Sequence, residues 1–368
     1  MALPSNKMFL RSPFWVTKTR ANLGYIIVEL TVWTGDLTTD EPTDPSLTLR
    51  STAFEGTAKI DIAEFARDQV EVIFSGNQES NAVWVKTEVT WWDNDGTTTG
   101  TDSPVYYTGL DGFSYFEEGV NYQYPFNVLL GSDRVRTYED TNYKIPVLQD
   151  KLSSYGLQYW NGYAWLEFHT VTGLAPVEDT SEVIQYIDTS NSGTYAERVQ
   201  SNYTSGPSEY VYIDYEPCVK QTYTQVYFVN RYGAMQEMVC FGRFDVSLST
   251  TSESYKRNLS EFDGTYNESR HQQAILRKNG KISFSISTGW YKEDENDTFT
   301  EMFLSEQVWV RVNRDSLGLG WMPKTSSTFI VPANLKGNDL KMKTQRFDKL
   351  INYTLNFEAA ADRINSVR

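Results

Sequence analysis

The residues best suited to chemistry in this sequence are few and widely separated. His169 and His271 are the only two histidines, and neither has an acidic residue or a cysteine at a spacing typical of metal ligands. No nucleophile motif, phosphate-binding loop or dinucleotide fingerprint occurs. Cys218 and Cys240 are the only cysteines, so we expect two buried thiols and no disulfide framework. We predict no catalytic residue, no metal site and no cofactor.

Two acidic segments are candidates for a cation site, and both have a simpler interpretation. The sequence Asp93-x-Asp95-Gly96 resembles the start of a calcium loop, but the twelfth position is Pro104 and not an acid. The alternative is an ordinary hairpin loop. The run 293–297 is acidic as well, and acids suit the N-terminus of a helix because they complement its dipole.

A glycosidase would need two carboxylates beside a cleft lined by aromatic rings. Tryptophans with acids nearby occur at Trp91–Trp92, Trp160 and Trp165. With 48 acidic residues in the chain such neighbours arise by chance, so we favour aromatic residues of a core or an interface. The sequence therefore predicts a protein that is not an enzyme.

Composition indicates an all-β protein with an acidic surface. The 368 residues include 48 Asp and Glu against 33 Lys and Arg, a net charge of −15 that disfavours specific binding of nucleic acid. Aromatic residues make up 14% of the chain, and Tyr, Trp, Phe and Thr favour strands. No apolar run is long enough for a membrane span, and the first residues do not resemble a signal peptide, so we expect synthesis in a cytoplasm without export.

Alternating apolar and polar residues predict many short strands and few helices. The fold class that follows is all-β, with two or three β-sandwich-like domains and a few short helices. We place an N-terminal β domain at residues 1–130, a middle β region at 131–216 and a C-terminal β domain at 217–368. The segment 177–207 is expected to be a polar connection. The clearest predicted strands are Tyr25–Trp33, Lys59–Ile62, Ala82–Trp92, Gln158–Trp160, Ala164–Phe168, Glu209–Tyr215, Tyr223–Val229, Met238–Phe244, Ile282–Ser287 and Val308–Val312.

Three predictions concern helices and the end of the sequence. A two-turn helix is expected at Ala63–Val70 with Asp61 as its N-cap, and a second helix at 297–304 in the C-terminal domain, capped by Asn296 or Asp297. Alternation from Ile351 to Phe357 predicts a strand, and the alanines that follow it predict a helical tail over 359–368. That tail either covers its own sheet, which we favour, or contacts a neighbouring subunit.

Aromatic side chains are concentrated in the stretch 105–127, which shows no clean periodicity and is expected to be a loop-rich segment. Tyr and Trp are enriched where protein surfaces bury one another. We therefore expect an assembly component. The candidate interface residues are Tyr106, Tyr107, Phe113, Tyr115 and Phe116, together with Ile364 and Val367 in the tail.

Three segments resemble virion structural proteins of tailed bacteriophages, and more narrowly tail-associated proteins. They are 226–259, with an aromatic–Asn–Arg–aromatic–Gly turn at Phe228–Gly233; 282–312, with Thr288–Trp290 ending a strand; and 341–368. The stretches 60–70 and 111–121 agree more loosely. The resemblance implies a homo-oligomeric ring or adaptor in the virion tail, assembled in the host bacterial cytoplasm with tube, tape-measure, baseplate or connector proteins. The alternative is a receptor- or glycan-binding tail protein used in host adsorption.

Overall fold

The protein is all-β, as the sequence predicts, and most of its described residues lie in strands. The structure, a computed structural model, describes residues 6–363 except 71, 73, 75, 80–81, 97, 120–126, 139–141, 149–151, 173, 175–182, 205–206, 217–222, 259–263, 266–267, 314–327, 338–339 and 343–348. Within these residues the α-helices are α1 (Ala63–Arg67) and α2 (Asn296–Leu304). There are also two short 3-10 helices, η1 (Phe116–Glu118) and η2 (Glu293–Glu295).

The chain divides into two compact units that are not continuous in sequence. The first contains residues 1–219, 227–238 and 294–305, and the second contains 220–226, 239–293 and 306–368. The helix α2 therefore belongs to the first unit, whereas the sequence led us to expect it in the C-terminal domain. The three-part division at 130/131 and 216/217 stays a prediction.

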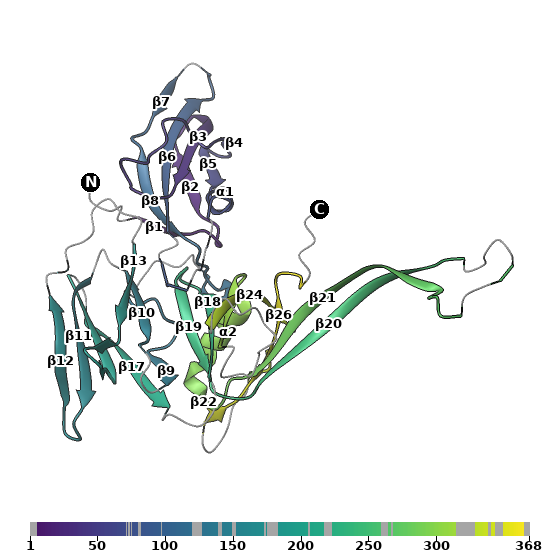
Figure 1. Cartoon of the computed structure of the whole chain (residues 1–368). Coiled ribbons are helices and arrows are strands. Elements are labelled where there is room, and N and C mark those ends of the chain that lie inside the picture. The colour runs from purple at the N-terminus through teal and green to yellow at the C-terminus, as the bar shows by residue number, and fades with distance from the viewer. Residues whose placement is uncertain are drawn as a thin grey trace. The chain divides into compact units, whose positions relative to one another are not determined.

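A sheet with the strand order β1-β8-β6-β3-β4 begins the first unit, with β7 paired to β6 (Figure 1). Its long central strands β3 and β6 alternate as expected, and one face of each is buried. A separate antiparallel pair, β2 with β5, packs on that face together with α1. The strands are β1 (Lys7–Phe9), β2 (Trp15–Thr19), β3 (Leu23–Trp33), β4 (Leu47–Thr52), β5 (Thr57–Asp61), β6 (Val83–Asp93), β7 (Thr99–Thr101) and β8 (Val105–Leu110).

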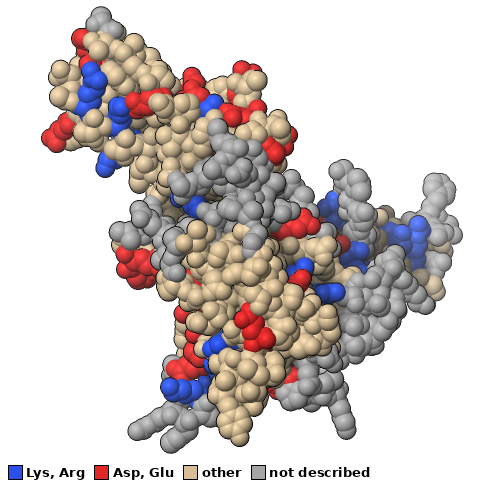
Figure 2. Space-filling model, turned by 90° about the vertical axis from the view of Figure 1, so that its left-hand side faces the viewer, with Lys and Arg blue, Asp and Glu red and all other residues tan. Residues whose placement is uncertain are grey.

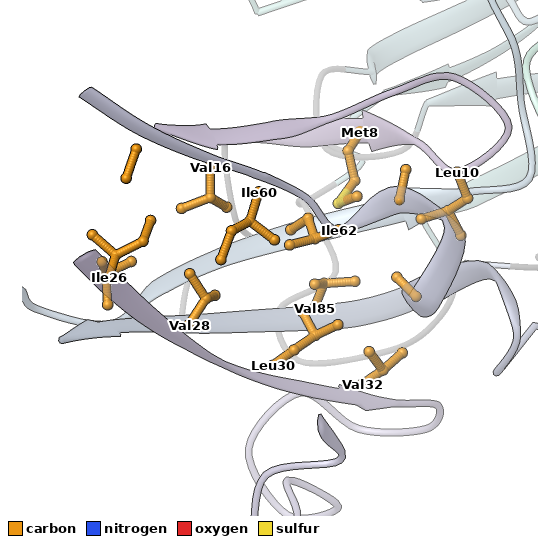
Figure 3. Close-up of a cluster of buried hydrophobic side chains, with 14 of the residues drawn as sticks. Met8, Leu10, Val16, Ile26, Val28, Leu30, Val32, Ile60, Ile62 and Val85 are labelled. Atoms are coloured by element: carbon orange, nitrogen blue, oxygen red, sulfur yellow. The ribbon is translucent and has the colours of Figure 1, made fainter. Parts of the chain in front are cut away.

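Aliphatic side chains from both layers fill the core of this sheet (Figure 3). Val28 and Val85 of the sheet and Ile62 beside α1 are fully buried there. The Asp61 carboxylate accepts the backbone N–H groups of Phe14 and Ala63. The N-cap position is held by Ile62 and not by Asp61, one residue away from the prediction. The helix α1 is also shorter than predicted, because it ends at Arg67.

The stretch 105–127 is not loop-rich throughout, contrary to our expectation. Its first residues form β8, which lies between β1 and β6 in the sheet. The buried run Thr108–Leu110 has neighbours on both faces, and this removes the alternation by which a half-buried strand is recognised.

A second sheet in the first unit has the order β12-β11-β16-β17-β9, and β10 pairs with β13 separately. The segment 177–207 is not simply a polar connection, because Val199 and Tyr203 of β16 and Ile187 of β13 enter the core of this region. These strands are not predicted from the sequence, because their alternating runs are short and polar residues flank them. The strands are β9 (Arg134–Tyr138), β10 (Lys144–Leu148), β11 (Leu152–Trp160), β12 (Trp165–Thr172), β13 (Ile184–Asp188), β14 (Ser190–Asn191), β15 (Thr194–Tyr195), β16 (Arg198–Tyr203) and β17 (Glu209–Glu216).

A buried cluster connects the first sheet of this unit with the β10–β13 pair. Trp33 and Trp84 come from the first sheet, Leu148 and Ile184 from the β10–β13 pair, and Tyr232 from the turn after β18. The shared cluster explains why residues 1–219 form one compact body.

The last sheet has the order β19-β18-β23-β24-β26-β21-β20. Strands β18 and β19 each contribute residues to both units, and the remaining strands belong to the second. The predicted strand at Met238–Phe244 is divided, because β19 ends at Cys240 and β20 starts at Phe244. The strands are β18 (Thr224–Val229), β19 (Met235–Cys240), β20 (Phe244–Lys256), β21 (Gln273–Ser287), β22 (Tyr291–Lys292), β23 (Val308–Asn313), β24 (Thr328–Lys336), β25 (Leu350–Ile351) and β26 (Thr354–Ala359).

The expected helical tail is wrong for the described residues after 358. Ala359 is the last residue of β26, is buried, and pairs with Ala333 of β24. Ala360 then donates its N–H to the carbonyl of Pro332. Strand pairing thus outweighs the helix propensity of the alanine run, which is only a weak preference. Residues 364–368 lie outside the described part.

Candidate assembly surfaces

The longest strands of the second unit form a two-stranded arm. β20 pairs with β21 from Phe244↔Ile286 to Lys256↔Gln273, whereas β26 pairs with β21 only over Ser283–Ser287. Beyond that point the two strands continue as a ribbon (Figure 1). An isolated two-stranded ribbon is at best marginally stable in water, so an arm of this length is suited to contact another surface.

Apolar side chains are exposed on the distal half of the arm. The exposed fractions are 57% for Ile275, 70% for Leu276 and 50% for Tyr255, and Leu248 lies nearer the base with 54%. The outer edge of β20 has no strand partner among the described residues, so its backbone groups are open to pairing. Both features are typical of a surface that is covered in an assembly.

The arm also differs from the remainder of the chain in charge. Residues 251–280 contain five Lys and Arg and four Asp and Glu, a net charge of +1. The rest of the chain contains 28 Lys and Arg and 44 Asp and Glu, a net charge of −16. Figure 2 shows acidic and basic side chains interspersed on one face of the molecule, with broad uncharged areas between them. A slightly basic arm is electrostatically complementary to an acidic partner such as another copy of this chain.

The described end of the chain follows the base of the arm. Arg363 donates its backbone N–H to the carbonyl of Gly280, and Asn279 donates to the Asp362 carboxylate at 2.5 Å. Glu358 forms ion pairs with Lys281 and Lys336. These contacts lie within one chain and attach the tail to its own sheet as far as residue 363. The predicted interface residues Ile364 and Val367 lie outside the described residues.

The predicted interface residues Tyr106 and Tyr107 of β8 are half-buried within the first unit. Tyr106 donates to the Glu41 carboxylate and packs edge-on against Trp33 at 6.4 Å between ring centroids. Tyr107 contacts Phe14 at 5.2 Å and adjoins the core of the first sheet. Both rings therefore already pack against other residues of the same chain.

The other three predicted residues follow β8, two of them in the loop and Phe116 at the start of η1, and they differ in exposure. Phe113 is buried and packs edge-on against Tyr115 at 5.6 Å. The guanidinium of Arg231 stacks on the Tyr115 ring at 4.5 Å, and burial raises the pKa of Tyr115 to about 12. Phe116 has 96% of its surface exposed, so it is the member of this group that is available to a partner.

The aromatic–Asn–Arg–aromatic–Gly segment forms a buried turn after β18. Asn230 is fully buried, and its Oδ1 accepts the N–H groups of Tyr232 and Ala234. Its Nδ2 donates to the Leu129 carbonyl at 2.7 Å and to Gln236. Gly233 has a φ of +79°, a conformation that side chains disfavour. The motif therefore has a structural role in the first unit.

The helix α2 brings a buried carboxylate, Glu301, to the same turn. Its Oε2 lies 3.5 Å from the backbone nitrogen of Arg231, and its side chain occupies the space left by the missing side chain of Gly131. Burial raises the pKa of Glu301 to about 8, although Arg231 opposes the shift. Sequence reasoning missed this residue. Its spacing from Thr298 and Met302 would have placed it on the buried face of the helix.

The predicted strand end Thr288–Trp290 is a second structural turn, located in the second unit. Thr288 is fully buried, and its hydroxyl accepts the N–H of Tyr353 at 2.9 Å. Gly289 has a φ of +79° and lies against Phe241, while Trp290 is 55% exposed. Hydrogen bonds between Thr288 and Tyr353 thus attach the end of β21 to the segment just before β26.

The candidate cation and thiol residues are engaged within the chain or buried. Arg20 forms an ion pair with Asp93 at 3.0 Å, and Thr98 donates twice to Asp95 in the β6–β7 hairpin. Cys240 is buried, which raises the pKa of its thiol to about 12. Cys218 lies outside the described residues. Within the described residues there is no cluster of three or more His, Cys, Asp and Glu suited to a metal ion.

Comparison with known proteins leaves the family open. No protein-family model matches the sequence, and no curated protein does either. In the part of the chain that the structure describes, no helix has the length and apolarity needed to span a membrane.

Proposed function

We propose that the protein is a non-enzymatic structural subunit of a bacteriophage tail that assembles with copies of itself into a ring or adaptor. The β20–β21 arm is the observation that carries the proposal. It exposes Ile275, Leu276 and an unpaired strand edge, none of which its own sheet covers within the described residues.

A second copy of this chain is the partner that the charges favour. The arm segment 251–280 carries +1 and the remainder −16, so an arm reaching onto a neighbour reduces repulsion between acidic subunits. A contact between an arm and a different surface of the next copy is heterologous, and repeated contacts of this kind form a ring where the rotation closes and an open filament where it does not. The resemblance of the arm segment and its neighbours to tail-associated proteins agrees with such a ring in the virion.

Sedimentation velocity of the purified full chain tests the assembly. We expect a concentration-dependent oligomer that the double variant Ile275→Asp with Leu276→Asp shifts toward monomer by at least tenfold in dissociation constant. Phe54→Asp is the matched control, because Phe54 is 78% exposed and lies in the first unit, away from the arm sequence. A chain that stays monomeric, alone and with the tube, tape-measure, baseplate or connector proteins of its particle, would contradict the proposal.

The virion location needs a separate observation. Antibody raised against the chain should label the tail in electron micrographs of intact particles. Label confined to the capsid, or no label on particles whose lysate contains the protein, would refute the tail assignment while leaving self-assembly standing.

A further inference from the structure

The outer face of the β12-β11-β16-β17-β9 sheet carries a row of amide side chains in fixed orientation. Gln158, Gln200 and Asn202 come from the neighbouring strands β11 and β16, where Gln158 pairs with Arg198 and Ser154 with Asn202. Their inward neighbours, including Val199 and Tyr203, fill the core. Alternation along the strands therefore places the amides on the face opposite the core.

Hydrogen bonds connect these amides in one direction. Gln158 Nε2 donates to Gln200 Oε1 at 2.9 Å, and Gln200 Nε2 donates to Asn202 Oδ1 at 3.1 Å. Asn202 Nδ2 then donates to the Ser154 hydroxyl at 3.1 Å. An amide nitrogen has two hydrogens, and Gln158 is buried with 6% of its surface exposed, so the N–H groups left for a ligand are those of Gln200 and Asn202. The row thus presents oriented donors.

Aromatic rings flank the row at the end near Arg198. The guanidinium of Arg198 lies 4.2 Å from the centroid of Trp165 and 4.7 Å from that of Tyr210, and it donates to Gln158 Oε1. Trp160 contacts Trp165 at 5.5 Å and is 46% exposed. Arg198 is thereby held by its neighbours, and it fixes the rings beside the amides.

The charges on this face are balanced, which restricts the class of ligand. Arg134 pairs with Asp214 at 2.7 Å and Arg136 pairs with Glu216, while Glu167 of β12 lies on the same face as Arg198. These three arginines thus share the face with an equal number of carboxylates. A face without net charge offers no attraction to a polyanion such as nucleic acid. Fixed amides and exposed indole rings suit an uncharged, hydroxyl-rich ligand with flat apolar faces.

We infer that this face binds a neutral polysaccharide chain, with hydroxyl groups on the amides of Gln200 and Asn202, which Gln158 orients from below, and sugar rings stacked on Trp160 and Trp165. The inference is independent of the arm and goes beyond the proposed assembly role. The other aromatic-rich stretch, 105–127, is less suited to stacking on sugars, because most of its described rings are packed within the chain.

Affinity electrophoresis of the full chain in gels containing dextran, mixed-linkage β-glucan or galactan tests the inference, with polygalacturonate as the charged counterpart. We expect retardation by at least one neutral polymer and none specific to polygalacturonate. Gln200→Leu keeps the size of the side chain and removes its hydrogen bonds, and Trp160→Ala removes an exposed ring. Each should reduce the retardation at least fivefold. Trp290→Ala, an exposed tryptophan of the second unit, should leave it unchanged.

Three results would overturn the inference. The first is the absence of retardation by every neutral polymer, and the second is equal retardation of the wild type, Gln200→Leu and Trp160→Ala. The third is a change in sedimentation of Gln200→Leu without a change in retardation, which would make the face an interface between copies. Near-ultraviolet circular dichroism shows whether each variant is folded. Because the arm residues are untouched, failure here leaves the assembly proposal unaffected.

Discussion

The Glu301 carboxyl group occupies space that is open only because residue 131 is glycine. A Cβ atom at Gly131 would lie 3.0 Å from the Glu301 Cδ and closer still to Oε1. The same carboxyl group is 3.5 Å from the backbone nitrogen of Arg231. Through these contacts α2, the loop at 131 and the turn after β18 are joined inside the first unit.

The stability of the first unit should fall as pH rises, because of Glu301. Its pKa is about 8 in the folded chain and about 4.5 in the unfolded chain, so the folded state binds the proton more tightly. The contribution is therefore complete below pH 4.5 and is lost as pH rises to 8. Glu301→Gln mimics the protonated acid and should be more stable than the wild type at pH 9 by on the order of 5 kcal/mol, but similar at pH 5.

Urea unfolding at pH 5 and pH 9 measures this difference, since other groups titrate equally in both proteins. Glu117→Gln, at an exposed position of η1 in the first unit, is the control and should follow the wild type at both pH values. Parallel pH profiles for the wild type and Glu301→Gln would show that the burial of Glu301 has no such effect.

Gly131→Ala should destabilise the first unit by about 1–3 kcal/mol, because the added methyl group must displace a buried carboxyl. The double-mutant cycle with Glu301→Ala identifies the cause, since the alanine at 131 should cost less than half as much once the carboxyl is removed. Thermal unfolding followed by circular dichroism gives all four stabilities. Strict additivity would mean that the two residues do not interact.

Asn230→Ala should cost roughly 2–4 kcal/mol, because it removes four hydrogen bonds and leaves buried N–H and C=O groups without their partner. Asn230→Asp retains the two acceptor bonds but places a carboxylate against the Leu129 carbonyl. Its stability should therefore improve as pH falls, which the alanine variant does not show. Denaturant unfolding at pH 4.5 and pH 7.5 compares them, and equal pH responses would argue against the described role of Nδ2.

The sequence predicted the all-β class and several strands because half-buried strands alternate, as in β3, β6 and β17. It failed where that signal is weak. Strand β8 is buried on both faces, β13 and β16 are short runs between polar flanks, and Ala359 stays in a strand despite a helix-forming run. The candidate surfaces were harder to predict. Ile275 and Leu276 look like core residues until the lack of a third strand is known, and the amide row depends on the register between β11 and β16.

The central claim is that the arm contacts a second copy of this chain, and photo-crosslinking from its distal end tests it most directly. A benzophenone amino acid at position 276, whose native side chain is 70% exposed, should yield a covalent dimer whose second peptide comes from another copy outside residues 244–287. The same amino acid at position 54 should yield none. Oligomers that form normally while position 276 gives only intramolecular or no adducts would contradict the account.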